Sequence, residues 1–200
     1  MAIRAVIWDL GGVLVRTIDH TPRRRWETRL GLEPNGLESI IFDSPVSRQA
    51  SIGLAEPEAI WDWTAEQLGL SPEALAQLQT DFWAGDQLDE ELVASIAGLR
   101  PAVKTGMITN AWKSIRPRIE EEWRLAPAFD DIVVSAEVGL AKPHPAIYRL
   151  ALERLGVDAP ETVFIDDFEE NVAAARALGI HAIRFRDRDQ VLRDLRPLVP

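Results

Sequence analysis

The stretch VIWDLGGVLV, Val6–Val15, decides the fold. A short apolar run ends on Asp9, and two glycines, Gly11 and Gly12, follow after a single leucine. Apolar β-rich residues predict a buried strand. Residues without side chains let the backbone come close to a small ligand. The stretch therefore predicts a carboxylate at the tip of a buried strand, beside a site for something small.

The composition is that of a globular protein with one core and a modest insertion. The chain has 200 residues, of which 46% are hydrophobic and 27% are charged. It has no cysteine, which excludes disulfides and thiolate metal sites and fits a reducing compartment. No apolar run is long enough for a signal peptide or a membrane span. We expect a cytoplasmic protein that does not bind a membrane.

The charge is acidic and unevenly placed. The net charge is −10; no Lys or Arg lies between Gln49 and Leu99, and ten acidic residues lie between Glu56 and Glu91. Such a chain repels phosphate backbones, so we expect no nucleic-acid partner. The one basic cluster is Arg23, Arg24, Arg25 and Arg29. We interpret it as a solvated helix face rather than a patch for a substrate phosphate.

Strand-like and helix-like runs alternate in the second half of the chain. Strands are predicted within 102–109, 131–135, 161–166 and 180–185, and helices within 114–123, 145–156 and 170–179. Residues 3–9 supply a further strand. This alternation predicts an α/β protein whose parallel sheet has helices on both faces.

Residues 16–90 differ because only helical patterns occur there. Helices are predicted within 56–69 and 71–83, the second with a Ser–Pro start. We predict a core of residues 1–15 and 91–200, with an all-helical insertion of residues 16–90. The insertion holds Trp26, Trp61, Trp63 and Trp83. We expect them to build its interior rather than a platform for sugars.

Polar residues follow the predicted strands, and ligands of open parallel sheets bind at the carboxyl ends of strands. Each residue has an ordinary explanation by itself: a helix cap, a turn or a surface lysine. Their occurrence in order at successive strand ends favours a shared site. The residues are Asp9, Thr109, Asn110, Lys142, Asp166 and Asp167.

This set suits the chemistry of a phosphate ester. A phosphoryl group needs an in-line nucleophile, donors for its oxygens and a cation that absorbs charge. Asp9 and Asp167 could ligate Mg²⁺, and Lys142 would neutralise the phosphate and the surplus carboxylates. Gly11 and Gly12 would bring backbone groups to the phosphate and the metal.

Four motifs make the chain resemble the haloacid dehalogenase superfamily, over essentially its whole length. They are WDLGGVL, MITNAW, GLAKPHPAIY and VFIDDFEENVAAARALGI. The resemblance implies a Rossmann-like core and a helical cap after the first strand. The chain is most similar to small bacterial sugar-phosphatase-like members whose first motif is DLGN or DLGG.

The resemblance also implies residue roles. Asp9 would be the nucleophile that forms an aspartyl-phosphate, and Thr109 would bind the transferred phosphoryl group with Asn110 beside it. Lys142 would be the lysine of the third motif, and Asn171 would orient the carboxylates. The Mg²⁺ ligands would be Asp9, the carbonyl of Gly11, Asp167 and, directly or through a second shell, Asp166.

Two positions depart from the family pattern. Most of its phosphatases carry a general acid two residues after the nucleophile, where this chain has Gly11. His144 stands where aspartate is more usual, and we interpret it as an orienting or surface residue.

The leading interpretation is a Mg²⁺-dependent phosphatase acting on small phosphorylated metabolites, with sugar phosphates as one candidate class. A catalytically weakened phosphate-binding or regulatory protein is the alternative that Gly11 favours. A metal-independent 2-haloacid dehalogenase ranks lower, because a doubled carboxylate makes little sense without a cation. The substrate and the oligomeric state cannot be read from the sequence.

Overall fold

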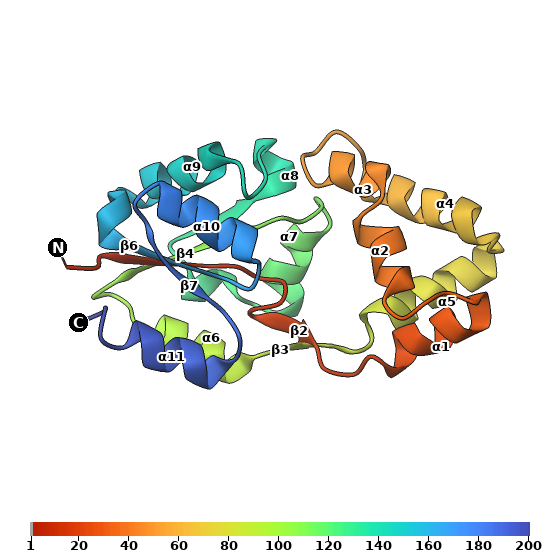
Figure 1. The fold of residues 1–200 in the computed structure, drawn as a ribbon, viewed down its shortest axis with the longest axis horizontal. Helices are drawn as coiled ribbons and strands as arrows, with labels where there is room; N and C mark the ends of the chain where they lie inside the picture. Colours follow the sequence, from red (N-terminus) through yellow and green to blue (C-terminus); the bar gives the residue numbers. More distant parts are fainter. Residues whose placement is uncertain (1) are drawn as a thin grey trace.

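A five-stranded parallel sheet forms the centre of the core in the computed structural model, which describes residues 2–200. The strand order is β5-β4-β1-β6-β7 (Figure 1). The strands are β1 (Ala5–Trp8), β4 (Lys104–Thr109), β5 (Asp131–Val134), β6 (Thr162–Asp166) and β7 (His181–Arg184). All five predicted strands are confirmed, and the central position of β1 places Asp9 in the middle of one sheet edge.

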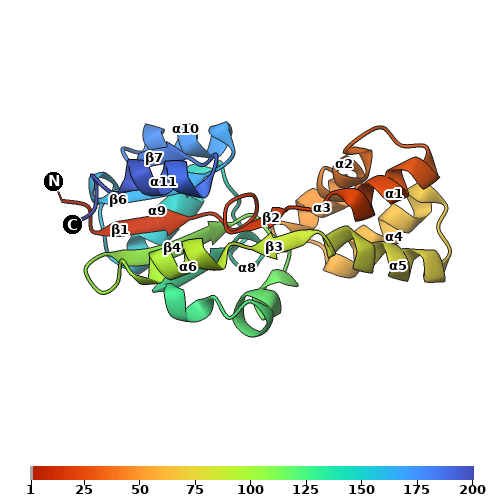
Figure 2. The same cartoon turned by 90° about the horizontal axis from the view of Figure 1, so that it is seen from below.

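Helices cover both faces of this sheet, as predicted. Alternate residues of β1 point to opposite faces: Val6 and Trp8 pack in one buried cluster, Ala5 and Ile7 in the other. The first cluster is closed by α6 (Glu90–Ala97) and α11 (Arg188–Leu195), the second by α9 (Pro145–Leu155) and α10 (Glu169–Ala177). Figure 2 shows α6 and α11 on one side of the strands. The predicted α/β fold is therefore confirmed.

Five helices form the insertion, which we call the cap. They are α1 (Thr21–Leu30), α2 (Gly36–Phe42), α3 (Pro45–Ala50), α4 (Pro57–Leu68) and α5 (Pro72–Trp83). They bury a cluster that includes Trp26, Leu37 and Phe82, with Trp61 and Trp83 packed against it. The division into a core of 1–15 and 91–200 and a cap of 16–90 stays a prediction.

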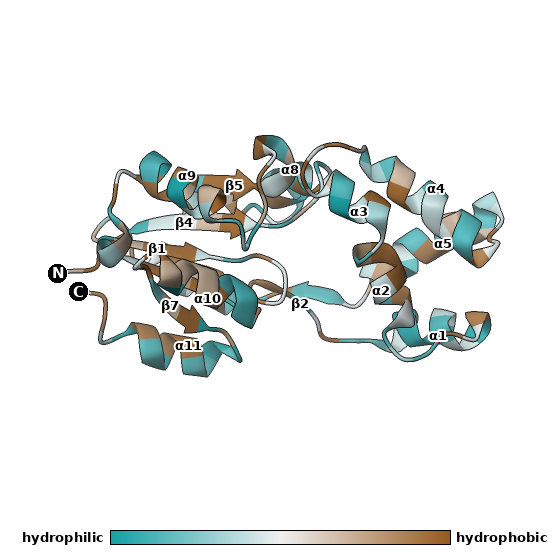
Figure 3. Cartoon of the chain, turned by 45° about the horizontal axis from the view of Figure 1, so that its top comes forward, coloured by the Kyte–Doolittle hydropathy of each residue, from teal (hydrophilic) through white to brown (hydrophobic). Residues whose placement is uncertain are grey.

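The ends of the cap are not helical, which corrects the sequence-based expectation. β2 (Val15–Thr17) and β3 (Asp86–Leu88) pair antiparallel and connect the cap to the core (Figure 1). Strands of three residues are too short to show a period in the sequence. Figure 3 shows that β2 is mostly hydrophilic, since Arg16 and Thr17 follow Val15, whereas β1 and β5 are mostly hydrophobic.

The prediction that all four arginines of the basic cluster form a solvated helix face is wrong for one of them. Arg24, Arg25 and Arg29 are on the surface as predicted, but Arg23 is buried. Its Nε donates to the Phe82 carbonyl at 2.8 Å, and its guanidinium pairs with Glu38 and Asp86. Arg23 therefore ties α1 to α2, α5 and β3 as an internal brace.

The predicted helix over residues 114–123 is irregular. It consists of α7 (Ile115–Pro117) and a π-helical turn, η1 (Arg118–Glu122). The remaining elements are η2 (Ala126–Ala128), α8 (Ser135–Val138) and η3 (Ala159–Glu161). No helix within residues 2–200 is long and apolar enough to cross a membrane.

Candidate active site

The carboxyl ends of three neighbouring strands bring the predicted polar residues to one edge of the sheet. Trp8 of β1 pairs with Met107 of β4 and Ile165 of β6. Asp9 therefore lies between the ends of β4 and β6, where Thr109 and Asp166 are the last residues of their strands. Thr109 is buried, with 3% of its surface exposed.

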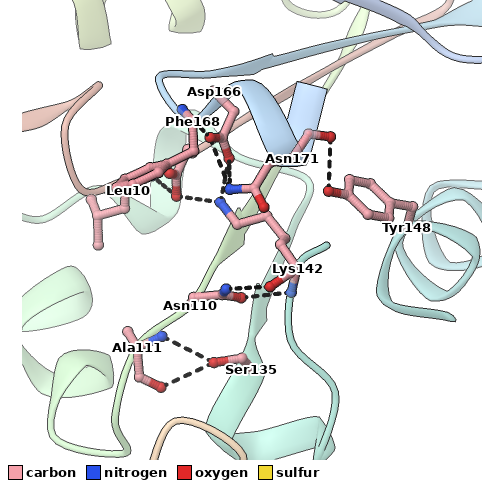
Figure 4. Close-up of polar contacts among 10 residues, drawn as sticks. Leu10, Asn110, Ala111, Ser135, Lys142, Tyr148, Asp166, Phe168 and Asn171 are labelled. Atoms are coloured by element: carbon pink, nitrogen blue, oxygen red, sulfur yellow. Dashed lines mark hydrogen bonds and ion pairs between the residues drawn. The ribbon is translucent and has the colours of Figure 1, made fainter. Parts of the chain in front are cut away.

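An ammonium group joins two of the carboxylates. Lys142 Nζ lies 2.7 Å from Asp9 Oδ1 and 2.7 Å from Asp166 Oδ2. All three side chains are buried, with 8% or less of each exposed. Figure 4 shows the lysine reaching Asp166 from the loop before α9. The ammonium group is thus placed between two carboxylates, and a catalytic role for Lys142 stays a prediction.

Hydrogen-bond donors surround the same carboxylates. Asn171 Nδ2 lies 2.9 and 3.0 Å from the two oxygens of Asp166, and the Phe168 amide donates to Asp166 Oδ1 at 2.8 Å (Figure 4). The Leu10 amide donates to Asp9 Oδ1 at 2.7 Å. These contacts support the orienting role expected of Asn171. Tyr148, which the sequence did not single out, donates its hydroxyl to the Asn171 carbonyl at 3.0 Å.

Asn110 holds the main chain of Lys142. Its Nδ2 donates to the Lys142 carbonyl, and its Oδ1 accepts from the Lys142 amide, both at 2.8 Å. A binding role for Asn110 toward substrate stays a prediction. Ser135 fixes the neighbouring residue, because its Oγ accepts from the Ala111 amide at 3.0 Å and donates to the Ala111 carbonyl at 3.2 Å. Ser135 follows β5 directly, and this position at a strand end was the only signal for it.

The three carboxylates fit a hard divalent cation. One oxygen from each of Asp9, Asp166 and Asp167 lies within 4.8 Å of the others. Asp167 Oδ1 is buried and has no hydrogen-bond partner within residues 2–200. Burial raises the pKa of Asp9 to about 7, with neighbouring carboxylates adding to the rise and the Lys142 ammonium opposing it. Burial and the Asp166 charge also raise the pKa of Asp167. The site thus holds more carboxylate charge than Lys142 offsets, and an oxygen-binding cation such as Mg²⁺ suits this donor set.

The two glycines of the first motif have different reasons to be glycine. Gly12 has a φ of +76°, and a Cβ there would lie 2.2 Å from Asp167 Oδ2. A Cβ on Gly11 would meet nothing within 4 Å, and Gly11 is exposed. Only Gly12 is therefore required for the close approach of the backbone to a site carboxylate.

His144, two residues after Lys142, caps a helix. His144 is exposed and caps α9, where its Nδ1 accepts from the Ala146 amide at 3.2 Å. This agrees with an orienting or surface role. Asp19 accepts from the Thr21 amide at 2.8 Å, and hydrogen bonds from Thr21 hold the pKa of its carboxyl below the usual range. Asp19 and His20 lie directly before α1, at the start of the cap.

Comparison with known proteins identifies the family. The profile of the haloacid dehalogenase-like hydrolases matches residues 3–179. The chain belongs to this family. The family resemblance and the hydrolase assignment drawn from the motifs are therefore confirmed.

Named relatives of this hydrolase include two phosphatases. It is 30% identical to the sesquiterpene phosphatase astK of Aspergillus oryzae, over 98% of this chain and 96% of that protein. It is also 30% identical to phosphatase MT3486 of Mycobacterium tuberculosis, over 99% and 96%. The bifunctional epoxide hydrolase 2 of Sus scrofa is 28% identical over 98% of this chain, which spans 38% of that longer protein.

A solved structure shows the same fold. The chain superposes on the family enzyme bt-2542 of Bacteroides thetaiotaomicron, solved with magnesium and inorganic phosphate. The TM-score is 0.77 at 22% identity, covering 95% of this chain and 99% of that one. An L-2-haloacid dehalogenase of Xanthobacter autotrophicus also superposes, with a TM-score of 0.66 at 20% identity, covering 99% of this chain and 85% of that one. At these identities the likeness supports the fold.

The glycine geometry generates a test of the carboxylate site. Gly12→Ala must displace Asp167 and strain the backbone, so we expect Mg²⁺ affinity to fall by about tenfold or more. Gly11→Ala is the matched control, since its added methyl group meets nothing, and should keep most of the affinity. Titration calorimetry with Mg²⁺ measures both variants. An equal loss in the two would contradict the close approach at Gly12.

Proposed function

We propose that the protein is a Mg²⁺-dependent phosphatase of small phosphorylated metabolites, acting through an aspartyl-phosphate on Asp9. The observation that carries the proposal is the buried ion-pair arrangement of Asp9, Lys142 and Asp166, with Asp167 within reach of the same cation. The phosphatase relatives support it. Cytoplasmic location and a small-molecule partner stay predictions.

The residues divide the work as follows. A carboxylate oxygen of Asp9 attacks phosphorus, the P–O bond to the ester oxygen breaks, and the departing oxygen takes its proton from water, because position 11 carries no acid. Water then attacks the aspartyl-phosphate, which releases inorganic phosphate and frees Asp9. Lys142 offsets the charge of the phosphoryl oxygens and of Asp166, and Thr109 would donate its hydroxyl to the phosphoryl group.

Asp9, Asp166 and Asp167, with the carbonyl of Gly11, would hold the cation. When bound, Mg²⁺ would supply charge compensation for the phosphoryl oxygens and keep the nucleophile ionised. This requirement follows from the raised pKa of Asp9, because a protonated carboxyl group is a poor nucleophile.

The two alternatives make different predictions. A dehalogenase needs no cation, so a buried Asp167 oxygen with no partner within residues 2–200 argues against it. A phosphate-binding protein without catalysis would bind inorganic phosphate but turn over nothing. Mg²⁺-dependent turnover of an aryl phosphate identifies the phosphatase. If there is no turnover, binding of inorganic phosphate separates the phosphate-binding protein from the dehalogenase.

The nucleophile is tested by Asp9→Asn. The amide keeps the shape of the side chain but removes the attacking charge, so turnover of an aryl phosphate should fall by at least about a thousandfold. Removal of divalent cations by a chelator should abolish turnover by the wild type, and added Mg²⁺ should restore it. Wild-type rates in Asp9→Asn would exclude an aspartyl-phosphate.

Lys142 is tested by comparing two replacements. Arginine keeps a cation between Asp9 and Asp166, whereas methionine leaves buried carboxylates uncompensated. We expect Lys142→Arg to keep at least about ten times the activity of Lys142→Met, with some loss because the guanidinium has another shape. If both variants are equally inactive while binding inorganic phosphate normally, charge compensation is not the function of Lys142.

The absence of an acid at Gly11 predicts which leaving groups are favoured. General acid catalysis is worth about 10²–10⁴-fold, and its absence matters most for strongly basic leaving groups. We therefore expect aryl, acyl and anomeric phosphates to react faster than primary-alcohol phosphates such as sugar 6-phosphates.

The reciprocal variant is Gly11→Asp, which has free space for its Cβ. This variant should lower the ratio of aryl-phosphate turnover to primary-alkyl-phosphate turnover by about tenfold or more. Circular dichroism first verifies that the variant folds. Equal rates for both substrate kinds in the wild type, with chemistry rate-limiting, would contradict the prediction.

A further inference from the structure

Trp112 belongs to the core but packs inside the cap. It follows β4 by three residues, yet it lies in the buried cap cluster with Leu37 and Phe82. Its ring centroid lies 5.8 Å from that of Phe42 and 6.4 Å from that of Trp61. Trp112 is 9% exposed. The core therefore contributes one large side chain to the interior of the cap.

A hydrogen bond fixes the position of this indole. Trp112 Nε1 donates to Ser47 Oγ of α3 at 3.1 Å, and Ser47 is buried. Ser47 is held in turn, because its amide donates to Ser44 Oγ at 2.9 Å at the start of α3. Another core–cap pair, Lys113 with Glu56 at 2.5 Å, joins exposed side chains and adds little.

The same segment of chain carries the site. Thr109, Asn110 and Ala111 lie directly before Trp112. Ala111 is fixed at both its amide and its carbonyl by Ser135 Oγ. Asn110 is bonded to both main-chain groups of Lys142, whose ammonium meets Asp9. Trp112 thus follows Ala111 directly and lies two residues after Asn110, which holds the main chain of Lys142. A displacement of Trp112 would therefore pull on the segment that makes these contacts.

We propose that Trp112 is a positioning residue that couples the docked cap to the phosphate-binding segment. The expected effect of this coupling on catalysis rests on the proposed phosphatase function. Besides the β2–β3 connection, the indole of Trp112 is a buried attachment of the cap to the core. The cap can leave only if the indole leaves Ser47 or if residues 109–112 move with it. A seated cap therefore orders Asn110 and, through it, the loop of Lys142.

Hydrogen exchange tests the coupling without reference to catalysis. Trp112→Phe keeps most of the ring packing and loses the bond to Ser47, and Ser47→Ala removes the other partner. In peptides covering 107–113 and 140–146, amide exchange should rise by about fivefold in either variant, the effect of one net hydrogen bond. The matched control is Trp61→Phe, which alters the same aromatic cluster from the cap helix α4.

Binding of inorganic phosphate in the presence of Mg²⁺ gives the second measurement. Affinity should weaken by a similar factor in Trp112→Phe and Ser47→Ala and stay unchanged in Trp61→Phe. The double variant of Trp112 and Ser47 should be no worse than either single variant, because both remove one bond. The proposal would be overturned if amide exchange in Trp112→Phe were as slow as in the wild type. It would also be overturned if amide exchange rose equally in Trp61→Phe. Absence of phosphate binding in the wild type would instead contradict the proposed function, while the exchange data would still decide the coupling.

Discussion

The buried ammonium of Lys142 between two carboxylates is the interaction on which the site depends. Two like charges within 4.8 Å repel by at least about 3 kcal/mol at an effective dielectric constant of about 20. Asp166 is fully buried and Asp9 nearly so, and neither gains the hydration that would reduce this repulsion. Removal of one partner of such a pair leaves an uncompensated buried charge. The placement of Lys142 therefore constrains the surrounding chain.

The fold and a set of short hydrogen bonds hold Lys142 in this position. Parallel strands bring Asp9 and Asp166 to one edge because their carboxyl ends point the same way. Lys142 arrives from a loop 32 residues after Asn110, whose amide side chain bonds both main-chain groups of the lysine. Asn171 and backbone amides supply the remaining donors. The sheet edge therefore brings the charged groups of the site together, and hydrogen bonds from neighbouring residues fix their positions.

Much of this could be predicted from sequence because the signals are local. Every strand of the sheet has an apolar run, and the polar residues that follow the strands stand at the edge where ligands bind. Contacts between distant segments left no such signal. Ser135 and Tyr148 reach the site only through the arrangement of β5 and α9. Arg23 looked like a surface residue because its partners, Glu38 and Asp86, are far away in the chain.

Most of the cap sequence carries no positive charge, which bears on the need for a cation. A phosphate dianion approaching Asp9 meets a site that holds three carboxylates and one ammonium. Residues between Gln49 and Leu99 contain no Lys or Arg, and the buried Arg23 is already paired with Glu38 and Asp86. Most of the cap sequence therefore has no cation to offer the phosphate, and Lys142 alone cannot balance both the phosphate and the carboxylates. Charge balance at the sheet edge thus supports a divalent cation as part of the proposed activity, independently of any relative.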